Sequence, residues 1–138
     1  MLIVVIDGLG GGIGSQLVSQ LKGLLPSGTE VLALGTNSVA TEAMVKAGAN
    51  RGATGENAIR VMARQADVIL GPLGIIIPDA MMGEITAVIA EAVVDSRAKK
   101  LLLPVIQPHV ELVGITSQPL GGLIRAAVKR LMEISSEK

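Results

Sequence analysis

The chain has 138 residues, no cysteine, and equal numbers of basic and acidic residues, so its formal net charge is zero. These figures predict one domain over residues 1–138 and argue against a disulfide framework, a thiolate site and nucleic-acid binding. Phe, Tyr and Trp are all absent, which removes both aromatic stacking on a base or flavin and a tyrosine general acid.

The chain starts with an apolar run that stops at Asp7. This run has no basic leader and is too short to span a membrane, so it predicts a buried strand and a cytoplasmic protein. Further along, apolar runs alternate with helical periodicity, the pattern of parallel α/β folds. Strands are predicted over 2–6, 30–34, 67–70 and 100–106, helices over 12–24, 39–47, 56–66, 79–95 and 119–134, and a loop over 49–55.

The strand over 100–106 contains Pro104, which suits the edge of a sheet better than its middle. A turn over 107–109 and a fifth strand over 110–115 would then form a hairpin with an antiparallel edge strand. We therefore expect a three-layer α/β/α, Rossmann-like domain with a mostly parallel five-stranded sheet. Strand orders of the 3-2-1-4 and 2-1-3-4 types both remain open.

A glycine-rich segment joins the first strand to the first helix. Glycine lets a backbone turn tightly and approach a ligand closely, and a helix N-terminus attracts anions. The segment therefore predicts a site for a nucleotide, a dinucleotide or a phosphorylated metabolite; the alternative is a tight turn without a ligand. Its candidate ligand-binding residues are Asp7, Gly8, Gly10, Gly11, Gly12, Ile13 and Gly14. Asp7 has two interpretations: it caps the amides of its own loop, or it contacts a ribose hydroxyl or metal ion.

The spacing of this loop is similar to the cofactor loop of short-chain dehydrogenases, but the similarity stops there. Their catalysis needs a tyrosine, and the second strand ends in Gly35, Thr36 and Asn37, without the acidic or basic residue that contacts a ribose or its 2′-phosphate. A Walker A loop is also excluded, because no lysine follows Gly14.

Other loops at the carboxyl ends of the predicted strands extend the candidate site, since ligands of open parallel sheets bind there. The additional candidate ligand-binding residues are Gly35, Thr36, Asn37, Arg51, Asn57, Gly71 and Pro72. Arg51 offers a guanidinium for a phosphate. A metal site would have to use Asp7, Asp79 and Glu84, and no spacing recommends one.

The segment from Ile75 to Met82 is too apolar for an ordinary exposed loop. It is predicted to be buried in the core, to act as a lid, or, as we prefer, to form a homodimer interface.

His109 is the only histidine. Two alternatives to a binding protein therefore stay open: a small enzyme acting on a nucleotide or phosphorylated substrate with Asp7 or His109, and an oligomeric partner-binding protein.

Several stretches together resemble a short bacterial family known only as a domain of unknown function. They are 7–14, 33–37, 47–59, 67–76, 83–86 and 98–104, and the resemblance spans nearly the whole chain. It implies a stand-alone Rossmann-like protein and carries no assigned activity.

Overall fold

The structure, a computed structural model, describes residues 1–105 and 109–137. Its strands are β1 (Leu2–Asp7), β2 (Glu30–Gly35), β3 (Arg51–Thr54), β4 (Val68–Pro72) and β5 (Lys99–Leu103). Its helices are α1 (Gly12–Leu21), α2 (Ser38–Lys46), α3 (Glu56–Ala63), α4 (Ala87–Asp95) and α5 (Leu120–Ser136), with a short 3₁₀ helix, η1 (Leu73–Ile76), after β4.

The five strands form one sheet in the order β3-β2-β1-β4-β5, and every pair is parallel. The four strands that the sequence predicts correctly take the 2-1-3-4 order, one of the two left open, and β3 adds a further strand beside β2. In chain numbering this is the order of the first five strands of a doubly wound Rossmann sheet. The register pairs Asp7 with Gly35, so β1 and β2 end side by side.

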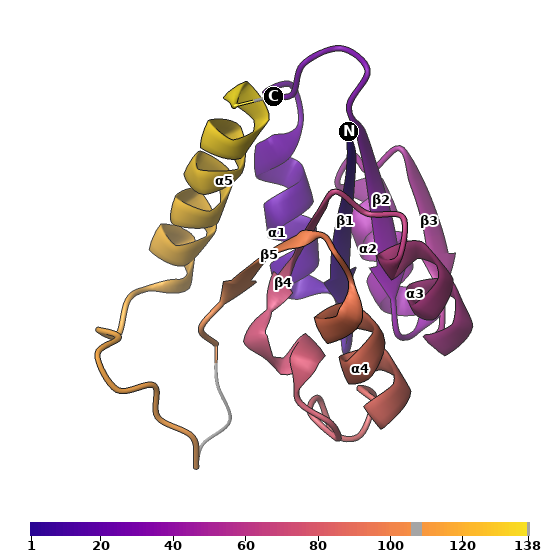
Figure 1. The fold of residues 1–138 in the computed structure, drawn as a ribbon, viewed down its shortest axis with the longest axis vertical. Helices are drawn as coiled ribbons and strands as arrows, with labels where there is room; N and C mark the ends of the chain where they lie inside the picture. Colours follow the sequence, from indigo (N-terminus) through magenta and orange to yellow (C-terminus); the bar gives the residue numbers. More distant parts are fainter. Residues whose placement is uncertain (106–108, 138) are drawn as a thin grey trace.

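Helices cover both faces of the sheet, as expected for a three-layer α/β/α architecture. Alternate residues of β1 enter opposite cores: Ile3 and Val5 pack with α1 and α5, whereas Val4 and Ile6 pack with α3 and α4. Figure 1 shows α5 lying beside α1, at a distance from α3 and α4. The central strand is therefore buried on both sides, which explains its continuous apolar sequence.

The predicted antiparallel edge strand is wrong. Residues 110–115 form no strand in the part of the chain that the structure describes, and Val113 is 93% exposed. An apolar run becomes a strand only where a neighbouring strand accepts its backbone hydrogen bonds, and β5 ends at Leu103, before Pro104. Part of the predicted turn over 107–109 lies outside the described residues.

Two other predicted elements differ from the structure. The predicted loop over 49–55 contains β3, a short and mostly exposed edge strand that pairs with β2. The predicted helix over 79–95 begins only at Ala87, where the Thr86 hydroxyl accepts a hydrogen bond from the Ile89 amide. The residues before it form turns instead, with Asp79 among those in the left-handed backbone region. No helix among the described residues is long and apolar enough to cross a membrane.

Candidate functional site

The glycine loop lies where the chain changes direction across the sheet. From β1 the chain runs through β2 to β3, and it then returns to the other side of β1 to form β4. Ligands of open α/β sheets bind at such a switch point, beyond the carboxyl ends of the strands. The arrows of β1, β2 and β3 in Figure 1 point to this edge, and the turns between η1 and α4 lie there as well.

Asp7 is 4% exposed and ends β1 beneath the loop. Its Oδ1 accepts a hydrogen bond from the Gly8 amide (2.8 Å), and its Oδ2 accepts one from the Gly14 amide (2.7 Å). Burial raises the pKa of this carboxyl group; the two amides oppose that shift, and the charge of Glu84 adds to it. In this structure both oxygens of Asp7 serve the loop itself, which is the capping interpretation.

Three glycines of the loop are closely packed against their neighbours. A Cβ on Gly8 would lie 2.7 Å from the Thr36 hydroxyl, and one on Gly14 would lie 2.5 Å from the Met44 sulfur. Gly11 has a φ of 74° and contacts the backbone of Ala40. A larger residue would force neighbouring side chains to shift at Gly8 and Gly14, and it would be strained at Gly11. These glycines therefore bring β1, α1 and the end of β2 close together.

Gly10 and Gly12 differ from the other glycines of the loop. Both are exposed, neither has a positive φ, and a Cβ on either would meet no atom of the described residues within 4 Å. Their amides donate no hydrogen bond to any of the described residues. The fold of the chain therefore does not need glycine at these two positions, and both leave open backbone N–H groups at the start of α1.

Glu84 reaches the loop from the turns between η1 and α4. Its Oε1 accepts hydrogen bonds from the Leu9 amide (2.9 Å), the Thr36 hydroxyl (2.5 Å) and the Asn37 side-chain amide (2.8 Å). The pKa of Glu84 is lowered, chiefly by the Thr36 hydrogen bond, and desolvation opposes this. The carboxylate is thus favoured in its charged form.

The end of β2 lies against the loop, as the sequence predicts. Asn37 caps α2 by accepting from the Ala40 amide (2.9 Å), and its side-chain amide also donates to the Leu9 carbonyl (2.9 Å). Gly35 has no room for a side chain, because a Cβ would lie 2.3 Å from the Thr41 hydroxyl. Gly35, Thr36 and Asn37 are therefore brought together with residues 7–14.

The side chains of Arg51 and Asn57 bond to other residues than those of the glycine loop. Arg51 pairs in register with Leu32, three residues before the end of β2, and forms an exposed ion pair with Glu30. Asn57 lies in the first turn of α3, where its side-chain oxygen accepts from Arg60 (2.7 Å).

Gly71 and Pro72 are buried at the end of β4, on the other side of β1 from β2. A Cβ on Gly71 would lie 2.5 Å from the Ile6 carbonyl oxygen, so this glycine allows β4 to approach β1. The two ends of the segment from Ile75 to Met82 differ in burial. Ile75 is fully buried in the core, whereas Met82 is 94% exposed. Part of the segment from Ile75 to Met82 therefore belongs to the core of the chain, and part of it is exposed; the homodimer interface stays a prediction.

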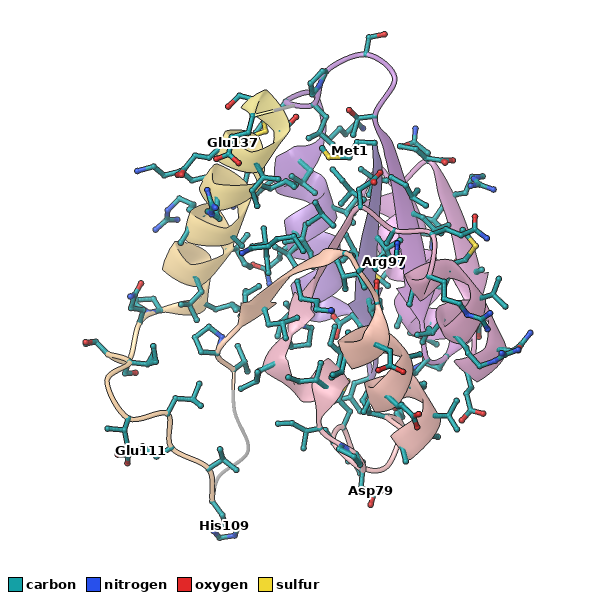
Figure 2. The ribbon with its side chains drawn as sticks, in the orientation of Figure 1. Met1, Asp79, Arg97, His109, Glu111 and Glu137 are labelled. Atoms are coloured by element: carbon teal, nitrogen blue, oxygen red, sulfur yellow. The ribbon has the colours of Figure 1, made fainter. Side chains whose placement is uncertain are left out.

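His109 lies apart from the loop. It is exposed, and Figure 2 shows it at the outer end of the segment that leads to α5, with its side chain directed away from the body of the protein.

Sequence reasoning named Glu84 only as one of three carboxylates for a metal site that no spacing recommended, and it missed the contacts of Glu84 with the glycine loop. No motif links it to Leu9, Thr36 or Asn37, which lie 47 to 75 positions away. The available signal was a set of turn-forming residues shortly before Thr86, namely Pro78, Asp79 and Gly83.

The fold and the loop together define an α/β protein with a parallel sheet and a glycine-rich turn at its switch point. The family described as Domain of unknown function (DUF3842) matches residues 2–136, so the chain belongs to that family. The resemblance inferred from the sequence is thereby confirmed.

Comparison with solved structures gives a likeness to a dodecameric FMN-dependent UbiX-like decarboxylase from Escherichia coli O157:H7. The TM-score is 0.45 and the sequence identity 14%, over 96% of this chain and 91% of that chain. No curated protein is detectably similar in sequence.

Proposed function

We propose that this protein binds a nucleotide, a dinucleotide or another phosphorylated small molecule at the glycine loop. The observation that carries the proposal is the pair Gly10 and Gly12, which are open to solvent and not required by the packing of the chain. Glycine in these positions costs conformational entropy on folding. A ligand that approaches the backbone closely would explain why glycine stands at both positions.

The chemistry of the loop suits a phosphate group. The amides of Gly10 and Gly12 are open donors, and the positive end of the α1 dipole lies behind them. Neither the loop nor the residues at the end of β2 contribute a basic side chain. The backbone would therefore provide the contacts to the anion.

Retention of a ligand is the first test. Gently purified protein is examined by native mass spectrometry, and ligand-free protein is then titrated with nucleotides, dinucleotides and sugar phosphates while thermal unfolding is followed. Binding to the native state raises the unfolding temperature. A protein that purifies empty and does not respond to any member of this panel would contradict the proposal.

The variant Gly12→Ala localises the binding. The new methyl group has room in the free protein, so the fold should be retained, but it would collide with a ligand in contact with the backbone. We expect a loss of affinity of about tenfold or more. Gly122→Ala, near the start of α5, is the matched control and should bind like the wild type.

A further inference from the structure

The carboxyl end of β2 has no acidic residue of its own, yet a carboxylate lies there. In doubly wound nucleotide-binding folds, an Asp or Glu about 20 residues after the glycine loop accepts hydrogen bonds from the ribose. In this chain β2 is followed by Thr36 and Asn37. Both side chains donate hydrogen bonds to Glu84, which comes from the opposite half of the chain.

The structure around Glu84 fixes its position. In the turns that carry it, the Asp79 amide donates to the Ile85 carbonyl (2.7 Å), and the Glu84 amide donates to the Met81 carbonyl (3.1 Å). The Met81 sulfur lies close to Gly8, 2.8 Å from where a Cβ would be. These contacts place the Glu84 carboxylate on the glycine loop.

The two oxygens of this carboxylate have different surroundings. All three hydrogen bonds go to Oε1, and no donor among the described residues reaches Oε2. Glu84 is only half-buried, and among the described residues no buried side-chain oxygen lacks a hydrogen-bond partner, so the unpartnered Oε2 is accessible as an acceptor. An ionised carboxylate accepts hydrogen bonds and donates none, and its natural partners are hydroxyl or N–H groups.

Leu9 connects this acceptor to the glycine loop. Its amide donates to Glu84 and its carbonyl accepts from Asn37, and Gly10 is the next residue. A hydroxyl acceptor and the open backbone donors therefore lie in one continuous stretch. This arrangement matches a molecule that carries hydroxyl groups next to a phosphate.

We propose that Glu84 accepts hydrogen bonds from the ribose hydroxyls of the bound ligand, a nucleoside diphosphate or a dinucleotide with unmodified 2′ and 3′ hydroxyls. This inference rests on the proposed function of the glycine loop. A ligand with a 2′-phosphate is disfavoured, because its charge would lie against the carboxylate.

The test compares ligands that differ only in the ribose. Adenosine diphosphate and its 2′,3′-dideoxy analogue are titrated into ligand-free wild-type protein by calorimetry, with inorganic pyrophosphate as a probe of the loop alone. We expect the wild type to bind adenosine diphosphate about tenfold more tightly than the dideoxy analogue, since hydrogen bonds to a charged group are strong.

Glu84→Gln changes the acceptor with little change of shape. The glutamine Oε1 retains the three donors, while an NH₂ group replaces the free oxygen. Adenosine diphosphate should then bind as weakly as the dideoxy analogue, whose affinity should stay unchanged. Glu133→Gln in α5, where Glu133 forms an exposed ion pair with Arg130, is the control and should retain the discrimination.

The outcomes separate the two proposals. If pyrophosphate binds and the wild type does not discriminate between the two nucleotides, the role of Glu84 is overturned and the loop remains an anion site. The same holds if pyrophosphate binds and adenosine diphosphate does not. If neither pyrophosphate nor adenosine diphosphate binds, the role of Glu84 is overturned, and the proposed function is then decided by the wider ligand panel.

Discussion

Asn37 and Glu84, 47 positions apart in the sequence, are joined by a hydrogen bond of 2.8 Å from the Asn37 side-chain amide to the carboxylate. The same amide donates to the Leu9 carbonyl, and the side-chain oxygen of Asn37 caps α2. One side chain thus holds the glycine loop, the start of a helix and the distant Glu84 in a single arrangement.

Asn37→Asp should separate these roles. Aspartate retains the helix cap, which it supplies as well as asparagine. It replaces the donor with a carboxylate oxygen that faces both Glu84 and the Leu9 carbonyl. We expect a loss of about 1–3 kcal/mol in the free energy of unfolding at pH 7, measured by urea denaturation. The loss should shrink in acid, where carboxylates become protonated; an equal loss at both pH values would argue against charge repulsion.

The acid stability of the protein should depend on Glu84. Its pKa is lowered in the folded protein from the ordinary value of 4.5. The unfolded chain then takes up a proton at higher pH than the folded protein does, so Glu84 stabilises the fold above pH 4.5 and this contribution is lost as pH falls through the folded pKa. As pH falls from 4.5 through the folded pKa, the free energy of unfolding should decrease more steeply for the wild type than for Glu84→Gln. Parallel curves of unfolding free energy against pH would contradict this.

The sequence predicts the elements of this fold best where one physical signal dominates. The strand at 2–6 is apolar throughout because both faces of β1 are covered, and α5 shows helical spacing because one face packs on the sheet. β3 has neither signal. It is a strand of four mostly exposed residues, Arg51–Thr54, and it forms because β2 offers it backbone partners.

The candidate site, like the fold, could be predicted only where one signal in the sequence dominates. The loop over 8–14 is evident from its glycines, and the end of β2 follows from strand order. Glu84 could not be placed, because the spacing of Met82, Ile85 and Ile89 fits a helix that continues back to Asp79. In the structure Met82 is exposed and its backbone is in the left-handed region, so of these three residues Ile85 and Ile89 enter the core and Met82 does not. Local periodicity does not reveal where tertiary contacts end a helix.

Gly14 and Gly122 form a matched pair for measuring the close contact of α1, since each is the third residue of its helix. Alanine is favoured over glycine in a helix by about 1 kcal/mol. At Gly122 the new Cβ has ordinary contacts, whereas at Gly14 it would lie 2.5 Å from the buried Met44 sulfur and 2.9 Å from the Asp7 Cβ.

We therefore expect Gly122→Ala to be neutral or stabilising. Gly14→Ala should be less stable than that control by about 1–3 kcal/mol, the cost of overpacking. Urea denaturation of both variants gives the difference. Equal stability of the two would mean that Met44 moves aside without cost, and the close approach of α1 would then not explain this glycine.

Met82 is the position where strain can be relieved most cleanly. Its φ is 58° and its side chain is 94% exposed, so the left-handed backbone is not offset by packing. A non-glycine residue in this region costs about 1–2 kcal/mol. Met82→Gly removes that cost, although the added freedom of the unfolded chain offsets part of the gain. We expect a net stabilisation of about 0.5–1 kcal/mol in urea denaturation.

Met81 supplies the contrast. Its φ is also 58°, but its side chain packs against the core between the sheet and helices α3 and α4, and it lies close to Gly8. Met81→Gly relieves the same backbone strain and loses that packing, a loss of about 2–5 kcal/mol for a fully buried methionine and less for this half-buried one. It should therefore be less stable than Met82→Gly, and it should also loosen the turns that position Glu84. If Met81→Gly were the more stable of the two, these turns would not be held by the contact between Met81 and the glycine loop.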